Sequence, residues 1–323
     1  MNTKTALVAL ALLALGGQMA THAATWTGGN TTSNWGDSTK WNPNTAPNGI
    51  GETATFDNSS FFGAGGTILL GTSSGVDTNI TIGTWTKSSA SLGRLVTINN
   101  VASGTGKLIF DVASGNATYY SSNGNSASGD TLNVGIQLND SLAVTVGGAA
   151  SVNFAGVVSE SGGSRSITKI GATTLIMSGG GANTFSGGVT INDGTVSAQK
   201  TGALGTGNVL VMETTGTTTA TLSITTGVTN AIADTAFLSL ESSGANFATV
   251  NLASGINETV GGLFFNGVAQ ADGTWGATGS GATNINDSWF TGAGIITVVP
   301  EPSTALLIAA GTIGMIFRRR FRA

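Results

Sequence analysis

The feature that most constrains the fold is a series of short apolar bursts separated by glycine-rich turns, clearest over residues 151–198. Within each burst apolar residues occupy every second position, as in Val152–Phe154, Leu175–Met177 and Val189–Ile191, and small polar residues such as Asn153 and Thr190 stand between most of them. A period of two places one set of side chains on one face of a sheet. Each burst has only about four to six residues, too few to enclose a core, so copies must stack on one another. The pattern therefore predicts a β-solenoid.

The same stretch resembles the autotransporter-associated β-strand repeat. Three segments carry the resemblance: Gly171–Gly179 (GATTLIMSG), Asn183–Ile191 (NTFSGGVTI) and Gly194–Val196 (GTV). Gly181 is one residue more than the commoner spacing of the family, and Ala203–Val209 is similar to the linker that usually follows such a repeat. The resemblance implies a bacterial surface solenoid and no particular chemistry.

Composition agrees with stacked strands and excludes several classes of function. The chain has 323 residues, of which 50 are glycine, 9% are charged and none is cysteine. Without cysteine there is no disulfide, thiol nucleophile or thiolate-bound metal. Residues 25–299 hold 15 acidic and 7 basic side chains and no basic patch, so nucleic acid is not an expected partner. We expect no metal and no cofactor.

Residues 1–24 have the pattern of a secretory signal peptide. Lys4 gives the positive start, Ala6–Leu15 the apolar core, and small residues around Ala23 and Ala24 the cleavage site. The pattern predicts export through the Sec translocon, and cleavage removes His22, the only histidine. The alternative, a short membrane anchor, conflicts with an apolar run that is too short to span a bilayer.

The C-terminal segment, residues 300–323, closely resembles a PEP-CTERM sorting signal. It contains, in order, Pro300, Glu301 and Pro302, the apolar run Ala305–Phe317, and an arginine cluster that includes Arg318, Arg319 and Arg320. The two prolines predict a stiff extended segment that a processing enzyme can bind. The apolar run is short for a stable span, and the arginines hold its end in the cytoplasm, so we expect transient membrane insertion.

The resemblance of the tail implies specific partners and a destination. An exosortase-type processing enzyme is expected to recognise Pro300–Pro302 and to pass the protein to the cell surface or to an exopolysaccharide matrix. The alternative is an ordinary C-terminal anchor that is retained in the inner membrane.

Two tryptophan-containing segments flank the predicted solenoid body. Residues 25–66 contain Trp26, Trp35 and Trp41 and resemble the opening cap of proteins with this repeat. Terminal coils need atypical caps, so the indoles are expected to cover the first coils. The alternative is a glycan-stacking platform, for which tryptophan is well suited. Residues 260–299 resemble a closing β module, in which Trp275, Trp289 and Phe290 seal the far end.

The body, residues 67–259, continues the same alternation, with a burst about every 10–14 residues. We predict a right-handed parallel β-helix with roughly 20–25 residues per coil, about a dozen coils and a length of about 55–60 Å. For residues 67–150 the spacing fits an antiparallel β-sandwich as well.

Two short patterns resemble catalytic motifs. Ser166 and Lys169 fit S-x-x-K, and Lys200–Gly202 fits K-T-G, as in penicillin-recognising enzymes. However, Ser166 lies in a strand-like run where a helix is required. Gly71–Gly75 fits the nucleophile-elbow pattern, but the mature chain has no histidine to act as the base. We interpret both patterns as chance matches.

The remaining catalytic candidates are acidic residues, because β-helix polysaccharide hydrolases and lyases use paired carboxylates. The acids that border the turns of the body are isolated in sequence, and stacked coils are needed to bring two of them together: Asp111, Asp130, Asp140, Glu160 and Asp193. We interpret them as surface residues that keep a weakly charged rod soluble.

The sequence therefore predicts an all-β, non-enzymatic, secreted structural protein of the cell surface or extracellular matrix. Two alternatives stay open. One is a carbohydrate-binding adhesin that uses exposed Trp residues or Asn and Thr ladders, and the other is a β-helix polysaccharide lyase or hydrolase.

Overall fold

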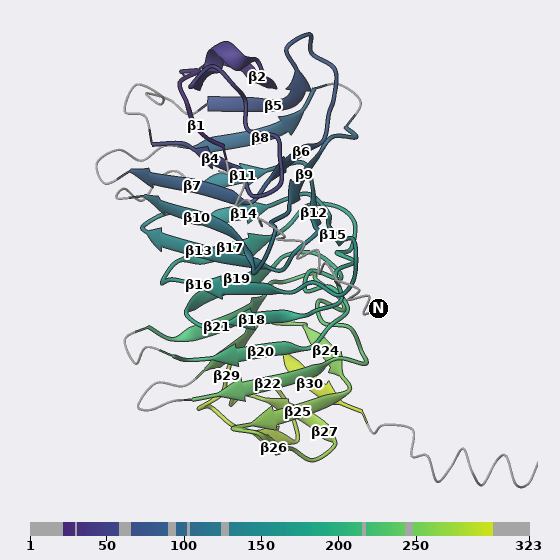
Figure 1. Ribbon diagram of the computed structural model, residues 1–323. Helices are drawn as coiled ribbons and strands as arrows, with labels where there is room; N and C mark the ends of the chain where they lie inside the picture. Colours follow the sequence, from purple (N-terminus) through teal and green to yellow (C-terminus); the bar gives the residue numbers. More distant parts are fainter. Residues whose placement is uncertain are drawn as a thin grey trace, which may run out of the picture.

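The computed structural model describes residues 22–29, 31–57, 66–89, 95–101, 104–123, 129–214, 218–242 and 248–299. Within these residues the regular structure is β-strand apart from one short 3-10 helix, η1 (Ser38–Lys40), and the strands and their connecting turns wind into one elongated stack of coils (Figure 1). This confirms the predicted β-solenoid. The right-handed winding, which connections between parallel strands strongly favour, stays a prediction.

Two long sheets form the sides of the stack. The first contains, in spatial order, β3 (Trp41–Asn42), β1 (Ala23–Trp26), β4 (Thr53–Thr55), β7 (Thr84–Ser89), β10 (Ala117–Asn123), β13 (Leu142–Gly148), β16 (Ile167–Ile170), β18 (Val189–Ile191), β20 (Val209–Met212), β22 (Phe237–Glu241), β25 (Gly262–Phe265) and β26 (Val268–Ala269). The second contains β2 (Ser33–Gly36), β5 (Gly66–Thr72), β8 (Val96–Asn100), β11 (Asp130–Leu132), β14 (Val152–Phe154), β17 (Thr174–Met177), β19 (Gly194–Ala198), β21 (Ala220–Ile224), β23 (Thr249–Leu252) and β29 (Phe290–Gly292).

Two smaller sheets lie along the remaining side and the C-terminal end. The third sheet is made of β6 (Ile80–Ile82), β9 (Lys107–Phe110), β12 (Gly135–Leu138) and β15 (Val158–Glu160). The fourth is made of β24 (Asn257–Val260), β30 (Ile295–Val298), β27 (Gly273–Gly276) and β28 (Asn284–Ile285).

Strands of successive coils pair in parallel and in register. Tyr119 pairs with Trp85 on one side and Val144 on the other, and all three side chains point into the core. The strands of residues 67–150 follow the same rule in all three sheets. The sandwich alternative is therefore wrong for this stretch.

The coils vary more in length than the sequence predicts. Paired positions in the first sheet are 20 residues apart between Ile191 and Val211, but 34 apart between Trp85 and Tyr119. The third sheet adds a strand to the 34-residue coil and also to coils of 25 residues, as between Tyr119 and Val144. The described residues between Val209 and Leu238, which are 29 positions apart, contribute no strand to that sheet. Among the described residues, ten successive strands of the first sheet are parallel, fewer than the predicted dozen coils. At about 4.8 Å per rung the stack is about 43 Å long.

The segment that resembles a repeat, residues 171–198, forms the three strands β17, β18 and β19 and follows directly after β16. Between β17 and β18 the chain makes a turn in which Asn183 and Phe185 are buried. The two glycines that follow lie where the backbones of neighbouring coils come close. A Cβ on Gly187 would lie 2.4 Å from the Arg165 carbonyl carbon, and one on Gly188, whose φ is +83°, would lie 2.2 Å from the Asn208 carbonyl oxygen.

Antiparallel strands close both ends of the stack. At the N-terminal end β3 pairs antiparallel with β1, and at the C-terminal end β26 pairs with β25 and β27 with β30. Such strands cover edges that would otherwise be open to another chain. Parallel stacking extends beyond the predicted body on both sides, because β1 and β4 already pair in parallel, as do β22 and β25.

Candidate functional site

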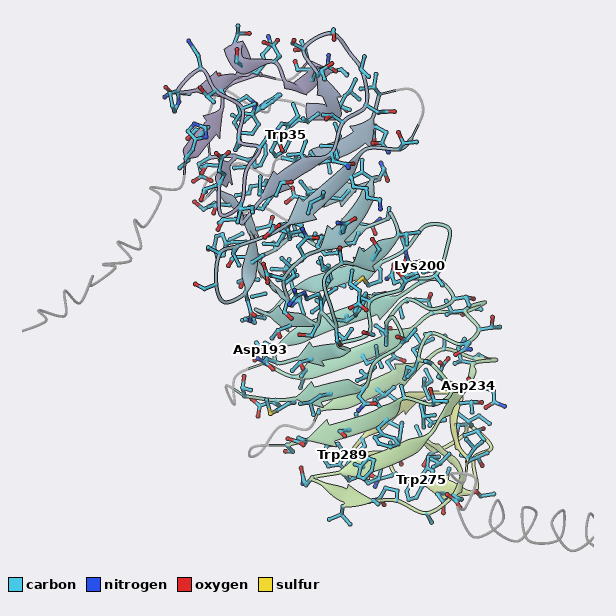
Figure 2. All side chains as sticks on the ribbon, turned by 45° about the vertical axis from the view of Figure 1, so that its right-hand side comes forward. Trp35, Asp193, Lys200, Asp234, Trp275 and Trp289 are labelled. Carbon is cyan, nitrogen blue, oxygen red and sulfur yellow. The ribbon has the colours of Figure 1, made fainter. Side chains whose placement is uncertain are left out.

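The three N-terminal tryptophans are buried in the first coils. Trp26, Trp35 and Trp41 are at most 1% exposed, and the ring centre of Trp41 lies 5.0 Å from that of Trp26 and 4.9 Å from that of Trp35. Trp35 Nε1 donates to the carbonyl oxygen of Pro47, and Trp41 Nε1 donates to that of Trp35. Figure 2 shows Trp35 inside the N-terminal end of the stack.

This burial corrects the glycan-stacking hypothesis. A sugar ring needs an exposed indole face, and none of the three indoles offers one. The residues occupy the position that the capping interpretation gives them, and the aromatic column continues inward through Phe56, Trp85 and Tyr119.

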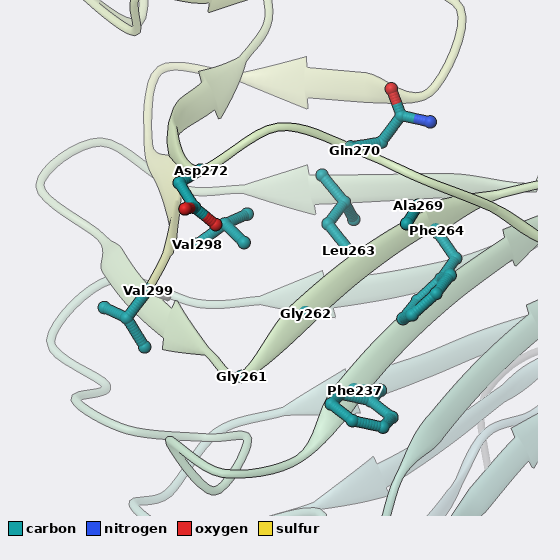
Figure 3. A pocket seen from close by; sticks show the side chains of 10 residues that line it. All are labelled: Phe237, Gly261, Gly262, Leu263, Phe264, Ala269, Gln270, Asp272, Val298 and Val299. Carbon is teal, nitrogen blue, oxygen red and sulfur yellow. The ribbon is translucent and has the colours of Figure 1, made fainter. Parts of the chain in front are cut away.

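The opposite end holds a second aromatic cluster and a shallow depression. Phe265 is stacked on Trp289 at 5.2 Å and contacts Trp275 edge-on at 5.4 Å. Figure 2 shows Trp275 and Trp289 at this end of the stack. Beside it lies a depression of about 220 Å³. Its lining is mainly apolar (Figure 3): Phe237, Gly261, Gly262, Leu263, Phe264, Ala269, Gln270, Asp272, Val298 and Val299. Asp272 is the one ionisable side chain among these, so this depression lacks a second group for acid–base catalysis.

The densest cluster of polar chemistry lies inside the stack, between the first and second sheets. Lys87 of β7 forms an ion pair with Oδ1 of Asp130 of β11, and both side chains are fully buried. The other carboxylate oxygen, Oδ2, accepts hydrogen bonds from Tyr119 Oη at 2.9 Å and from Ser121 Oγ at 2.7 Å. Burial and the neighbouring Asp130 raise the pKa of Tyr119 well above its usual value, so the phenol keeps its proton.

The sequence interpretation missed this cluster and placed Asp130 on the surface. Asp130 is only 1% exposed, because its strand alternates so that Asp130 and Leu132 face inward together. The signal was present in the alternation: Lys87 follows Trp85 by two positions and therefore shares its inward face. The sequence interpretation placed Asp130 beside a turn, because polar residues surround it in the sequence.

The other four acidic candidates hold the framework together. Their hydrogen bonds are Asn139 Nδ2 to Asp111 (2.8 Å), Val112 N to Asp140 (2.9 Å), Arg165 N and Ser186 Oγ to Glu160 (both 2.7 Å), and Thr218 Oγ1 to Asp193 (2.9 Å). Burial opposes ionisation of Glu160, but the donors from Ser186 and Arg165 outweigh it, and the pKa of Glu160 lies below its usual value. Within the described part of the chain, no three acidic or histidine side chains are grouped as a metal site would require.

Three further buried ionisable residues carry shifted pKa values. Burial raises the pKa of Glu258 to about 7, although its carboxylate accepts hydrogen bonds from Ala231 N and Ile232 N. Burial lowers the pKa of Lys169 to about 8 against the attraction of Asp193, and Lys169 Nζ donates to three backbone carbonyls. Burial likewise lowers the pKa of Lys200 to about 8, and its Nζ donates to the carbonyl oxygen of Gly156.

The two motif-like patterns do not form catalytic geometry. Ser166 and Lys169 are three residues apart at a strand, so they lie on opposite faces: Ser166 Oγ contacts Ser141 Oγ, while Lys169 points inward. Gly71–Gly75 forms a turn, in which the Thr72 and Ser74 hydroxyls share a hydrogen bond and Gly75 has a φ of +79°.

The predicted processing residues lie outside the described residues. These are Pro300, Glu301, Pro302, Arg318, Arg319 and Arg320, and the apolar run between them is outside as well. No helix within the described residues has the length and apolar character needed to cross a membrane. At the other end, Ala23 and Ala24, where signal cleavage is predicted, already belong to β1 and pair with Thr53 and Ala54.

Comparison with protein-family models gives two matches, each to a short part of the chain. Residues 167–198, which form β16 to β19, match the passenger-associated transport repeat, and residues 298–320 match the PEP-CTERM protein-sorting motif. Comparison with curated proteins and with solved structures gives no match. The sorting motif identifies the chain as an exported protein that exosortase-type machinery directs to the cell surface or the extracellular space.

Proposed function

We propose that the protein is a non-enzymatic structural rod of the cell surface or the extracellular matrix. The solenoid supplies a stiff body about 43 Å long, and antiparallel strands and aromatic clusters close both ends. The sorting motif follows the last strand, so the rod is delivered through its C-terminal end.

The observation that carries the proposal is that the candidate catalytic side chains form hydrogen bonds between coils. Asp111, Asp140, Glu160 and Asp193 accept hydrogen bonds from residues 25 to 28 positions away, that is, from neighbouring coils. Lys200 contacts a carbonyl 44 positions away. Each of these side chains therefore joins its own coil to another, which favours a structural role.

Cells of the producing organism provide the test. Deleting the protein should lower the elastic modulus of the matrix, and a variant with Asp140→Asn and Glu160→Gln should restore it. A second variant, Glu301→Ala, keeps the rod but alters the sorting motif, and should fail to restore it. The proposal is overturned if the purified protein releases reducing sugars from the host polysaccharide and the double variant loses that activity.

Carbohydrate binding is the second candidate, and one surface feature favours it. Thr53, Thr84 and Thr118 pair in register across β4, β7 and β10 and are half-buried on the outer face of the first sheet. Such a row places hydroxyl groups about 4.8 Å apart. Because the three N-terminal indoles are buried, we place the candidate glycan site on this polar row.

A pair of matched variants tests the row. Changing Thr53, Thr84 and Thr118 to Val removes three hydroxyl groups with little change in shape. The control changes Thr195, Thr221 and Thr249, which form a comparable row on the second sheet. On a glycan array, binding that only the first variant loses would support the site. Binding that both variants retain would rule out a glycan site on this row.

A further inference from the structure

Four polar side chains meet inside the solenoid without contact to solvent. Lys87 comes from β7, Tyr119 and Ser121 from β10, and Asp130 from β11, and none is more than 2% exposed. Lys87 and Asp130 belong to neighbouring coils and to different sheets. Their ion pair therefore connects two coils across the core.

Burying two charged groups in the core costs free energy. Removing an ammonium and a carboxylate from water costs more than their attraction returns unless further hydrogen bonds compensate. Here one carboxylate oxygen has two hydroxyl donors, and the other faces the ammonium and, at 3.4 Å, the backbone N–H of Val96. An amide would carry no charge and would keep the acceptor for both hydroxyl donors.

We propose that Lys87 and Asp130 become joined by an isopeptide bond after the chain has folded. The observations behind the proposal are the burial of both partners, their direct contact, and two hydroxyl groups fixed on the oxygen that the amide would retain. The bond would be a covalent cross-link in a chain that has no cysteine.

The reaction balances without any co-reactant. A proton passes from the Lys87 ammonium to Oδ1 of Asp130, and the neutral Nζ then attacks Cγ. Negative charge develops on Oδ2, where Tyr119 and Ser121 donate hydrogen bonds as an oxyanion hole does. The second Nζ proton goes to Oδ1, which leaves as water. The Nζ–Cγ bond forms, the Cγ–Oδ1 bond breaks, and nothing is oxidised or reduced.

Proximity and dryness favour the forward direction. The fold holds amine and carboxyl together, so the step has the advantage of an intramolecular reaction. The released water leaves a core lined by Trp85 and Phe154, which contact the Tyr119 ring at 5.2 and 5.4 Å.

The chain contains its own control. Lys169 is equally buried, but its Nζ donates to the backbone carbonyls of Ile170, Gly171 and Asp193. The carbonyl carbon of a backbone amide is a far poorer electrophile toward an amine than the carbonyl carbon of a carboxylic acid. Lys169 should therefore remain a free amine.

Tryptic mapping of the purified full-length protein tests the proposal. An isopeptide bond blocks cleavage after Lys87, so residues 41–94 should appear joined to residues 108–165, with a mass one water below the sum of the two. Cleavage after Lys169 should proceed. Separate linear peptides 41–87 and 108–165 would overturn the proposal, as would a loss of water that leaves the two peptides unlinked.

Variants locate the bond and probe its mechanism. Lys87→Met should abolish the mass deficit and Lys169→Met should keep it; if Lys87→Met does not fold, the wild-type map still decides. Tyr119→Phe removes one donor to Oδ2 and should slow bond formation by up to about 10²–10³-fold in protein sampled over time from cell-free synthesis. Tyr120→Phe, the outward-facing neighbour, should leave the rate unchanged. Equal rates in the two tyrosine variants would contradict the oxyanion role.

Discussion

The N-terminal coils and the coils of the passenger-associated transport repeat are stacked in the same way but filled differently. In the first, Phe56, Trp85 and Tyr119 form a column of stacked rings, and an ion pair crosses the core beside it. In the second, the inward positions are mainly aliphatic, as at Val189 and Val196.

The two regions also differ on their third side. The N-terminal coils have the third sheet there, whose ladder satisfies the backbone groups. In the repeat, residues 178–188 form a turn, and the side chain of Asn183 adds to the few backbone hydrogen bonds there: its Oδ1 accepts from Val158 N and its Nδ2 donates to Ala203 O. A solenoid can therefore dispense with one strand per coil where a single amide side chain bridges three successive coils.

The largest effect is expected from the aromatic column. Trp85→Ala leaves a cavity between Phe56 and Tyr119 and should lower the free energy of unfolding by about 3–5 kcal/mol. Val196→Ala changes an aliphatic core position of the repeat, on the second sheet. It removes two buried carbons and should cost about 2 kcal/mol. Urea unfolding measures both. Equal losses would mean that the two interiors contribute alike.

A smaller effect concerns the dependence of stability on pH. The pKa of Glu258 is about 7 when folded and near 4.5 when unfolded, so between these values the folded state binds more protons. The free energy of unfolding should therefore fall as the pH rises from about 4.5 to 7, by at most about 3 kcal/mol.

Two variants isolate that contribution. Glu258→Gln should flatten the slope between pH 4.5 and 7. Glu160→Gln should leave it unchanged, because the pKa of Glu160 is lowered and this group loses its proton below that range. If the free energy of unfolding of the wild-type protein rises with pH over this range, the raised pKa of Glu258 is contradicted.

The bridging role of Asn183 predicts the next effect. Asn183→Ala leaves Val158 N and Ala203 O buried without this partner and should cost about 2 kcal/mol. Asn133→Ala removes an exposed hydrogen bond to Asn99 and should change stability by less than about 0.5 kcal/mol. Comparable losses in the two variants would show that the turn of the repeat does not depend on this side chain.

The smallest effect should come from the outer threonine row. Thr84→Val alters a half-buried side chain on the outer face and should change the free energy of unfolding by less than about 0.5 kcal/mol. A larger loss would mean that the row supports the fold and is not available for binding.

The sequence predicts the solenoid because alternation determines which residues face inward, and this holds at Val152, Leu175 and Val189. The length of a coil could not be predicted, since the third side is a strand in some coils, as in β9, and a turn of variable length in others, as around Asn183. Lys87 and Asp130 were missed because charge outweighed position in the interpretation. Both side chains lie at inward-facing positions of the alternation, and each has its partner in a neighbouring coil. The strand register therefore predicts their burial, whereas their charge suggests exposure.

The most direct test of the account is the mass of the protein recovered from the surface or matrix of the cells that produce it. An exported rod processed at its sorting motif should end near Pro300–Pro302 and lack Arg318–Arg320. A recovered protein that still extends to Ala323 would contradict processing, and the rod would then be one that is retained by its C-terminal segment.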